Sequence, residues 1–274
     1  MSDLMKPGNN QDLTKRDDVT KKQGERIDDV GSRLKRELMA AMLDDPKPVL
    51  GKGESPRVIL ALANYRRSVW DQAKVLQADM FREAAGTGLE MKFAYYGPEV
   101  AGGVRTCRIT TRWISDAHDM ATVMGRAECV CGCYVQIKRV LGQALKETQE
   151  RSIQAMVIIG DAFHDDLDEA AILATKLRRA GTKLFMFQEG CNPLTEHAFK
   201  FLAEVSGGAY FQFEPSTEQR LAEMLKAVSH FATGGKEALE AKGGEAATLL
   251  LEQIIQVPVP LVEEDERVTP SAAR

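Results

Sequence analysis

The sequence IQAMVIIG, at residues 153–160, decides the fold because it is the most strand-like segment of the chain. A short apolar run of this kind is typical of a strand buried on both faces of a parallel sheet. After it, strand-like stretches at 183–188 and 209–213 alternate with helical patterns at 166–180, 194–206 and 217–232. Strands that alternate with helices predict parallel strands joined by right-handed crossovers.

The residues before this stretch add further strands. The apolar run RVILAL at 57–62 predicts another buried strand, and a helical pattern follows it over 70–85. Strands at 89–96 and 105–113 are separated only by a loop rich in Gly and Pro, so we expect them to pair antiparallel. Residues 56–234 are therefore predicted to form an α/β domain with a doubly wound, mostly parallel central sheet. One antiparallel edge strand and helices on both faces complete this prediction.

The two ends of the chain differ from this domain. Residues 1–50 are highly charged and partly helical, with a narrow apolar stripe at Ile27, Val30, Leu34, Leu38 and Met42. The pair Gly234-Gly235 predicts the end of the domain. Residues 235–274 then read as a C-terminal helix and a disordered tail, because VPVP at 257–260 precedes an acidic run.

Composition excludes several classes of function. The formal net charge is −4 and the basic residues are interspersed with acidic ones, which does not favour nucleic acid as a partner. No apolar run approaches the roughly 18 residues that a membrane-spanning helix needs, so no membrane insertion is expected. The five cysteines form no even-numbered framework, and the amino-terminal residues lack an apolar signal sequence. These features favour a cytoplasmic protein with reduced thiols.

Several short motifs, taken in order, resemble von Willebrand factor type A (VWA) domains. They are VILAL at 58–62, Trp70-Asp71, VIIGD at 157–161, FMFQEG at 185–190 and SGGAY at 206–210. The resemblance covers about residues 56–232 and is strongest to the intracellular bacterial members of the family. It implies a site for Mg²⁺ or a similar ion in three loops, which carry Asp-x-Ser/Thr-x-Ser, a Thr and an Asp.

This sequence departs from the family's ion-binding pattern in two of the three loops. The first loop reads ANYRRS at 63–68, with Ala63 where the resemblance places an Asp and with two arginines that would repel a cation. Val135 stands at about the position of the Thr. Asp161 remains, with Ser68 as a second weak candidate, and one carboxylate with one hydroxyl is too small a ligand set for Mg²⁺. We therefore predict a degenerate metal site and no cofactor.

The resulting prediction is a non-enzymatic module or scaffold that binds protein partners through loops at one edge of the sheet. No Ser-His-Asp order, phosphate-binding glycine loop or dinucleotide motif is present. The two arginines of the first loop either pair with Asp161 or are solvated. The predicted binding residues are Asn64, Tyr65, Arg66, Arg67, Ser68, Tyr134, Gln136, Asp161 and His164.

Four alternatives remain open at this point. The chain could be a metal-dependent ligand-binding protein that uses Mg²⁺ or Mn²⁺, or a structural subunit of an assembly. An enzyme such as a hydrolase using Asp161 is a third alternative. The segment CVCGC at 129–133 suggests a fourth, a thiol-based redox or metal-binding protein that uses Cys129, Cys131 and Cys133. The acidic run at 164–166 could also bind a metal, although acids at this position are typical of a helix N-cap.

Overall fold

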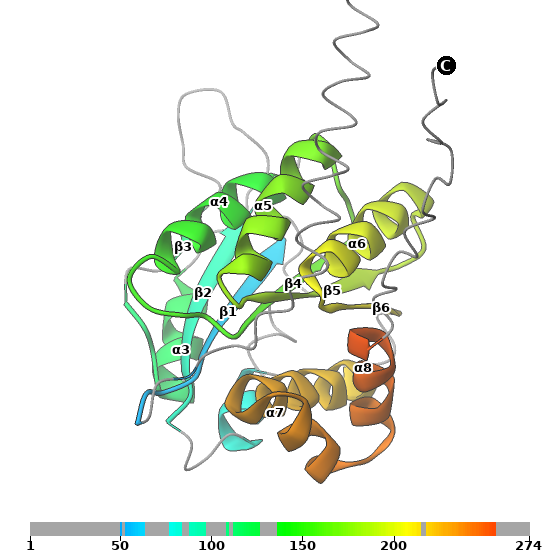
Figure 1. Cartoon of the computed structure of the whole chain (residues 1–274). Coiled ribbons are helices and arrows are strands. Elements are labelled where there is room, and N and C mark those ends of the chain that lie inside the picture. The colour runs from blue at the N-terminus through cyan, green and yellow to red at the C-terminus, as the bar shows by residue number, and fades with distance from the viewer. Residues whose placement is uncertain are drawn as a thin grey trace, which may run out of the picture. The chain divides into compact units, whose positions relative to one another are not determined.

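The structure is a computed structural model (Figure 1), which describes residues 50, 53–63, 77–83, 88–96, 108–109, 112–126, 136–214 and 218–255. The chain divides into two compact units, Met1–Ala40 and Ala41–Arg274, and every described residue belongs to the second. The charged extension predicted over 1–50 lies outside the described residues apart from Leu50, and so does the tail predicted after residue 256.

The described strands form one sheet of order β3-β2-β1-β4-β5-β6. All neighbours pair parallel except β3, which pairs antiparallel with β2. The predicted parallel α/β sheet is thus confirmed. The bounds are Arg57–Ala63 (β1), Glu90–Tyr96 (β2), Arg108–Ile109 (β3), Ala155–Gly160 (β4), Lys183–Glu189 (β5) and Ala209–Phe213 (β6).

An antiparallel edge strand was expected over 105–113, and four residues of this segment are described: 108, 109, 112 and 113. The described antiparallel pairing consists of β3, whose Ile109 pairs with Ala94, and of an isolated bridge between Ile114 and Met91. The registers of these two contacts differ by two residues, so they do not belong to one uninterrupted ladder. Residues 112 and 113 are not part of a strand, and residues 105–107 and 110–111 lie outside the described part of the chain.

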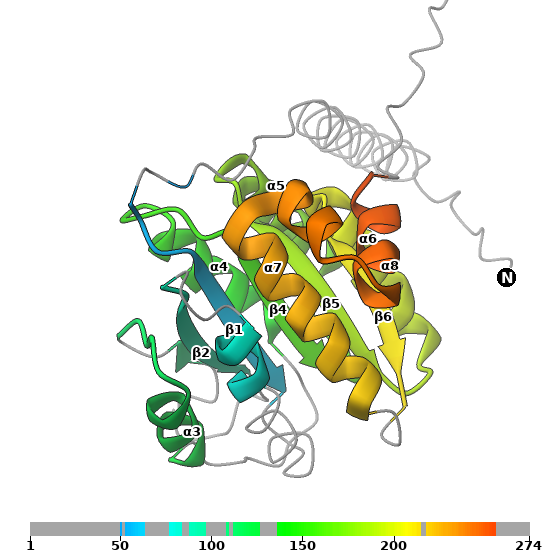
Figure 2. The same cartoon turned by 90° about the horizontal axis from the view of Figure 1, so that it is seen from below.

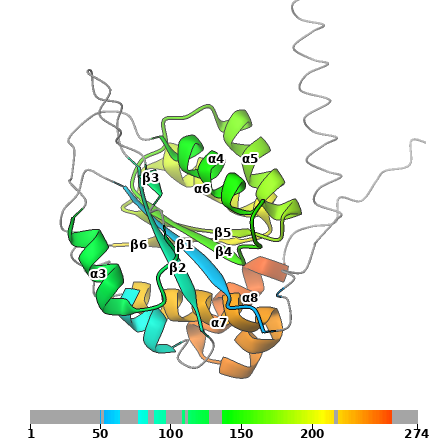
Figure 3. The same ribbon diagram turned by 90° about the vertical axis from the view of Figure 1, so that its left-hand side faces the viewer.

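Helices cover both faces of the sheet (Figure 3). One face is covered by α4, α5 and α6, and the other by α3, α7, α8 and a helical segment at 77–83. Helices on both faces were predicted, and that prediction is confirmed. The bounds are Ala117–Gly125 (α3), Ile137–Glu147 (α4), Leu167–Arg179 (α5), Pro193–Ser206 (α6), Glu218–Lys242 (α7) and Glu245–Ile255 (α8).

The alternation of side chains along the strands builds a core on each face. Leu60 and Phe185 are fully buried on the face that α7 covers, and Phe185 meets Phe231 of α7 edge-on, with ring centroids 5.4 Å apart. Ile59 and Ile158 are fully buried and point to the opposite face. Each such side chain contributes about 1.5–3 kcal/mol through burial, so the middle of the sheet holds the fold together.

The helical chain beyond Gly234 belongs to the same core. The backbone leaves the helical conformation at Gly234 and Gly235, and Gly235 has φ +68° and ψ −152°, a combination that only glycine adopts readily. The chain then turns back so that α8 lies beside α7 (Figure 2). Leu239 and Leu250 are fully buried in the core beneath these helices. The expected boundary at residue 234 is thus a bend inside the packed unit.

Charged side chains gather at the amino ends of β1 and β2, and we call this group the amino-edge cluster. Glu90 accepts hydrogen bonds from the guanidinium groups of Arg57 and Arg151, each at 2.8 Å. The ammonium of Lys92 lies 2.6 Å from a carboxylate oxygen of Glu147. Arg57 and Lys92 also lie 4.4 Å and 5.1 Å from the centroid of one indole ring. The cluster consists of Arg57, Glu90, Lys92, Trp113, Glu147 and Arg151.

Candidate functional site: the carboxyl edge of the sheet

The strand order places the candidate site between β1 and β4. The chain proceeds from β1 outward to β2 and β3, and then crosses to the other side of β1 to form β4. In open α/β sheets of this kind, ligands bind beyond the carboxyl ends of the strands at this reversal. The strand ends that meet there are Ala63, Tyr96 and Gly160.

These three residues close the crevice between the strands. Tyr96 on β2 pairs with Ala63 and is fully buried, and its hydroxyl donates a 2.7 Å hydrogen bond to the carbonyl of Ile159 on β4. The tyrosine therefore reaches across β1. A Cβ on Gly160 would overlap the hydroxyl oxygen of Tyr96 and would lie 3.5 Å from the Cβ of Ala63. The small residues at 63 and 160 thus make room for the phenol.

Ala63 is the position at which the resemblance places a metal-binding Asp. It lies at the end of β1 with 4% of its surface exposed, next to its pairing partner Tyr96. A methyl group offers no oxygen to a cation, so residue 63 is excluded as a ligand through its side chain. This position therefore contributes to packing.

Asp161, which directly follows β4, is half-buried at the same edge. Burial raises the pKa of its carboxyl group, and the nearby carboxylate of Glu189 at the end of β5 raises it further. Thr195 of α6 donates a hydrogen bond of 3.2 Å to the backbone carbonyl of Asp161. Two acidic side chains from neighbouring strands thus lie near each other, and their repulsion disfavours the charged form of Asp161.

The acidic run at 164–166 serves two helices. Asp166 is the N-cap of α5, because its carboxylate accepts the backbone N–H of Glu169 at 2.9 Å. Asp165 instead accepts the backbone N–H of Lys138 at 2.8 Å, at the start of α4. Burial raises the pKa of the Asp165 carboxyl. The expected capping role is confirmed for Asp166, and Asp165 caps a helix distant in sequence.

The other two described binding-loop residues lie beside these caps. Gln136 is half-buried at the N-cap position of α4, but its side chain makes no capping hydrogen bond, which explains why α4 uses Asp165. His164 is exposed at the turn between β4 and α5. An ion pair between Lys138 and Glu169 further ties α4 to α5. The edge near β4 is therefore a rigid platform with an exposed histidine.

The loop between β5 and α6 belongs to this edge and was missing from the sequence prediction. Leu194 is 79% exposed at the start of α6, and Cys191 is an exposed free thiol. Asn192 caps α6 by accepting the N–H groups of Leu194 and Thr195. The Asn-Pro pair at 192–193 is a helix-start signal. It could have been used to predict from the sequence that Leu194 lies in the first turn of the helix.

Nine of the predicted site residues lie outside the described residues, and the predictions about them are neither supported nor contradicted. Among the residues that the structure does describe, no three His, Cys, Asp or Glu side chains are grouped as a metal site would require. None of the described helices is long and apolar enough to cross a membrane. The nine residues are Asn64, Tyr65, Arg66, Arg67, Ser68, Cys129, Cys131, Cys133 and Tyr134.

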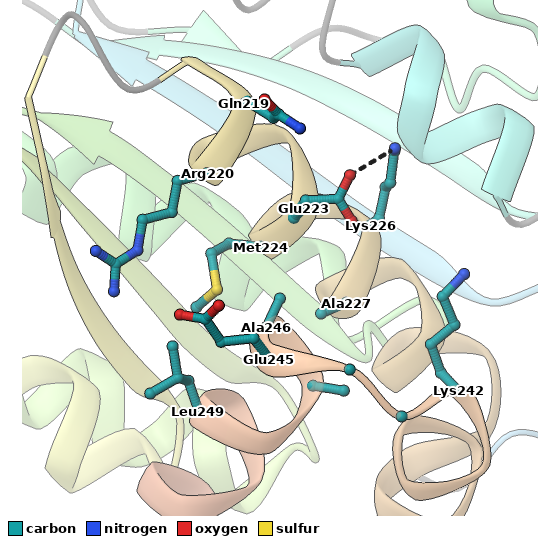
Figure 4. Close-up of a pocket in the computed structure, with 13 residues that line it drawn as sticks. Gln219, Arg220, Glu223, Met224, Lys226, Ala227, Lys242, Glu245, Ala246 and Leu249 are labelled. Carbon is teal, nitrogen blue, oxygen red and sulfur yellow. Dashed lines mark hydrogen bonds and ion pairs between the residues drawn. The ribbon is translucent and has the colours of Figure 1, made fainter.

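A separate cavity of about 560 Å³ lies between α7 and α8 (Figure 4). Its walls combine apolar side chains such as Met224 and Leu249 with charged ones. The ammonium of Lys226 lies 3.0 Å from a carboxylate oxygen of Glu223, and this hydrogen bond is the main cause of the raised pKa of Lys226. All lining residues come from α7, α8 and the turn between them, so the cavity is distinct from the carboxyl edge.

Comparisons with known proteins give matches only among solved structures, since no family model and no curated protein matches the chain. The SpRpn10 VWA domain is 11% identical with a TM-score of 0.47, over 62% of this chain and 94% of that one. Human COPII-coat protein Sec24c is 10% identical with a TM-score of 0.47, over 68% and 32%. Mussel byssus proximal thread matrix protein 1 with a zinc-occupied MIDAS motif is 11% identical with a TM-score of 0.47, over 64% and 46%.

The parallel core and the two helical layers are those predicted from the sequence. The described domain therefore has the doubly wound α/β fold that the resemblance to VWA domains implies. This assignment rests on the topology of the described strands, and it fixes the place of a site without fixing its chemistry.

Proposed function

We propose that this chain is a non-enzymatic protein-binding module that uses the carboxyl edge of its VWA-like sheet without a resident metal ion. The observation that carries the proposal is the closure of the β1–β4 crevice by Tyr96 over Ala63 and Gly160. The buried phenol occupies space between the described strand ends, beside the position where sheets of this kind bind small ligands. Recognition would then fall to the outer surface of the loops.

The outer surface of this edge suits a protein partner. Leu194 offers an apolar side chain that is 79% exposed, and His164 is exposed on the neighbouring loop. Leu194 lies in the capped first turn of α6 and His164 lies two residues before the N-cap of α5, so little backbone entropy is lost when a partner binds. The residues at 64–68, Tyr134 and Gln136 are proposed to widen the same surface. The exposed thiol of Cys191 suits a reducing compartment, and we place the protein in the cytoplasm.

The acidic groups near the edge favour the metal-free form of the proposal. Asp165 and Asp166 are engaged at the starts of α4 and α5, so their carboxylates support helices. Calorimetric titration of the full chain with Mg²⁺ and with Mn²⁺ is expected to show no saturable binding. A saturable affinity that disappears in Asp161→Ala would overturn the metal-free proposal in favour of a metal-dependent binder.

The binding surface itself is tested by substitution of Leu194. The full chain would be used to capture its partners from the native cell, alongside Leu194→Asp and the matched variant Gln149→Asp. Gln149 is exposed beyond the end of α4, near the amino ends of the strands, so its substitution adds the same charge at the opposite edge. We expect Leu194→Asp alone to lose the captured proteins. Equal recovery by all three would contradict the proposed surface.

A further inference from the structure

Strand β6 is the exposed end of the sheet. It has five residues, Ala209–Phe213, and only β5 pairs with it among the described strands. A strand at the end of a sheet presents peptide N–H and C=O groups that can pair with a strand of another molecule. Proteins commonly cover or interrupt such edges, so the groups that contact the edge of β6 are informative.

A single side chain from α8 occupies part of this edge. The backbone N–H of Tyr210 donates to Oε1 of Gln253 at 2.7 Å, and Nε2 of Gln253 donates to the carbonyl of Tyr210 at 2.8 Å. A primary amide has the donor and the acceptor of a peptide group. Gln253 therefore makes the two backbone hydrogen bonds that Tyr210 could otherwise exchange with a residue of a neighbouring antiparallel strand.

The position of Gln253 is fixed by its helix. Leu250 and Ile254, on either side of it in α8, are buried in the core beneath α7 and α8. Gln253 itself is half-buried. Its amide is thus held against β6 by the packing of the whole helix, and this distinguishes it from a flexible surface glutamine.

Space remains beside this contact, and the backbone of the edge continues past it. A groove of about 300 Å³ runs along the edge between α6 and α8, and it is lined in part by Lys200, Glu204 and Tyr210. Because backbone groups alternate along a strand, the N–H and C=O of Gln212 point the same way as those of Tyr210. The edge therefore continues beyond the reach of Gln253.

We propose that β6 is a latent self-pairing surface of this chain, and that Gln253 keeps it closed by acting as a surrogate strand. The occupant is a second copy, whose β6 would pair antiparallel with the first about a two-fold axis. Such a contact is self-complementary, since each strand offers the same donors and acceptors to the other. Lys200 pairs with Glu196 at 2.6 Å and Glu204 lies one turn further along α6, so both signs of charge flank the edge and the two-fold contact can place opposite charges together.

The test uses the full chain with Gln253→Ala and Gln253→Met, and with Gln219→Ala as the matched control. Methionine keeps the length and the helix propensity of glutamine but cannot form the two hydrogen bonds. Gln219 is exposed on α7. In both Gln253 variants we expect faster hydrogen exchange at the Tyr210 amide in the monomer, measured at concentrations too low for self-association. We also expect a self-association constant, measured by sedimentation, about tenfold above that of the wild type.

A second substitution identifies the surface that pairs. Gln212→Pro removes an N–H that points away from β5, which an edge strand tolerates, and in the Gln253→Met background it should return self-association to the wild-type level. Faster exchange at Tyr210 without increased self-association would overturn the proposal, and so would unchanged exchange. Self-association that survives Gln212→Pro would also overturn it, because the contact would then lie elsewhere. Circular dichroism of each variant confirms that the fold is retained.

Discussion

The two ends of strands β1 and β2 differ in the kind of side chain that packs there. At the carboxyl end, where sheets of this topology bind ligands, Tyr96 is packed over Ala63 and its hydroxyl meets a backbone carbonyl. At the amino end, the amino-edge cluster brings ionic side chains together around an indole ring. The comparison teaches that a concentration of charged groups need not mark the functional end of a fold.

The amino-edge cluster has a structural explanation. Its side chains cover the first residues of β2, where Glu90 and Lys92 make their ion pairs. Arg151 also donates a 2.7 Å hydrogen bond to the carbonyl of Ser55, just before β1. The ionic groups thus hold together the chain segments that meet at the amino ends of β1 and β2.

The largest effect is expected from breaking the packing at the carboxyl end. Gly160→Ala places a Cβ where the hydroxyl of Tyr96 lies, so either the phenol or the strand must shift. We expect a loss of about 2 kcal/mol in the free energy of unfolding, measured with urea. Tyr96→Phe removes the overlapping oxygen, so Gly160→Ala should cost less in that background. The same cost in both backgrounds would show that Tyr96 does not constrain residue 160.

A smaller effect is expected at the amino end. Lys92 is almost completely buried, and Glu147→Ala leaves its ammonium without the carboxylate at 2.6 Å. Since Glu147 is itself partly exposed, we expect a loss of about 2 kcal/mol at most in chemical denaturation. Lys92→Met should cost less, because it removes the buried charge together with its need for a partner. Glu150→Ala, at an exposed residue nearby, serves as the control and should change stability by about 0.5 kcal/mol or less.

The sequence allowed the parallel core to be predicted because continuous apolar runs such as 153–160 have few alternative structures. It also allowed the carboxyl edge to be located, since topology alone determines where strand ends meet. The reach of Tyr96 to Ile159 was not predictable, because it depends on the register of three strands, and a slip of one residue would turn the side chain to the other face.

Other features were hidden for different physical reasons. Lys92 is a lysine inside a strand, and its burial is made tolerable by the ion pair with Glu147, which lies 55 residues away in the sequence. The contribution of Leu239 and Leu250 to the core was obscured by the glycines at 234–235, which normally end a helical unit. The sequence suggests that Leu194 follows a helix cap. It does not show that the side chain of Leu194 points away from the protein.

The smallest expected effect is the pH dependence of the contribution that Asp161, at the carboxyl end, makes to stability. Burial, and then repulsion from Glu189, raise the pKa of Asp161 above its ordinary value of 3.8 in the folded state. The folded protein then holds this proton more tightly than the unfolded chain, so the contribution of Asp161 to stability declines as pH rises from 3.8 through the folded-state pKa. We expect Asp161→Asn to be more stable than the wild type at pH 7, and this advantage to shrink toward pH 3 in urea denaturation.

Glu83 supplies the comparison of opposite sign. Hydrogen bonds from His230 first, and then from Lys242, lower the pKa of Glu83 from 4.5 to about 2. Its contribution to stability is therefore present above pH 4.5 and is lost as pH falls toward 2. Glu83→Gln should be less stable than the wild type at pH 7, with a difference that also shrinks on acidification. If Asp161→Asn instead lowered stability at pH 7, as Glu83→Gln is expected to do, the carboxylate of Asp161 would be stabilised by its surroundings, contrary to the structure.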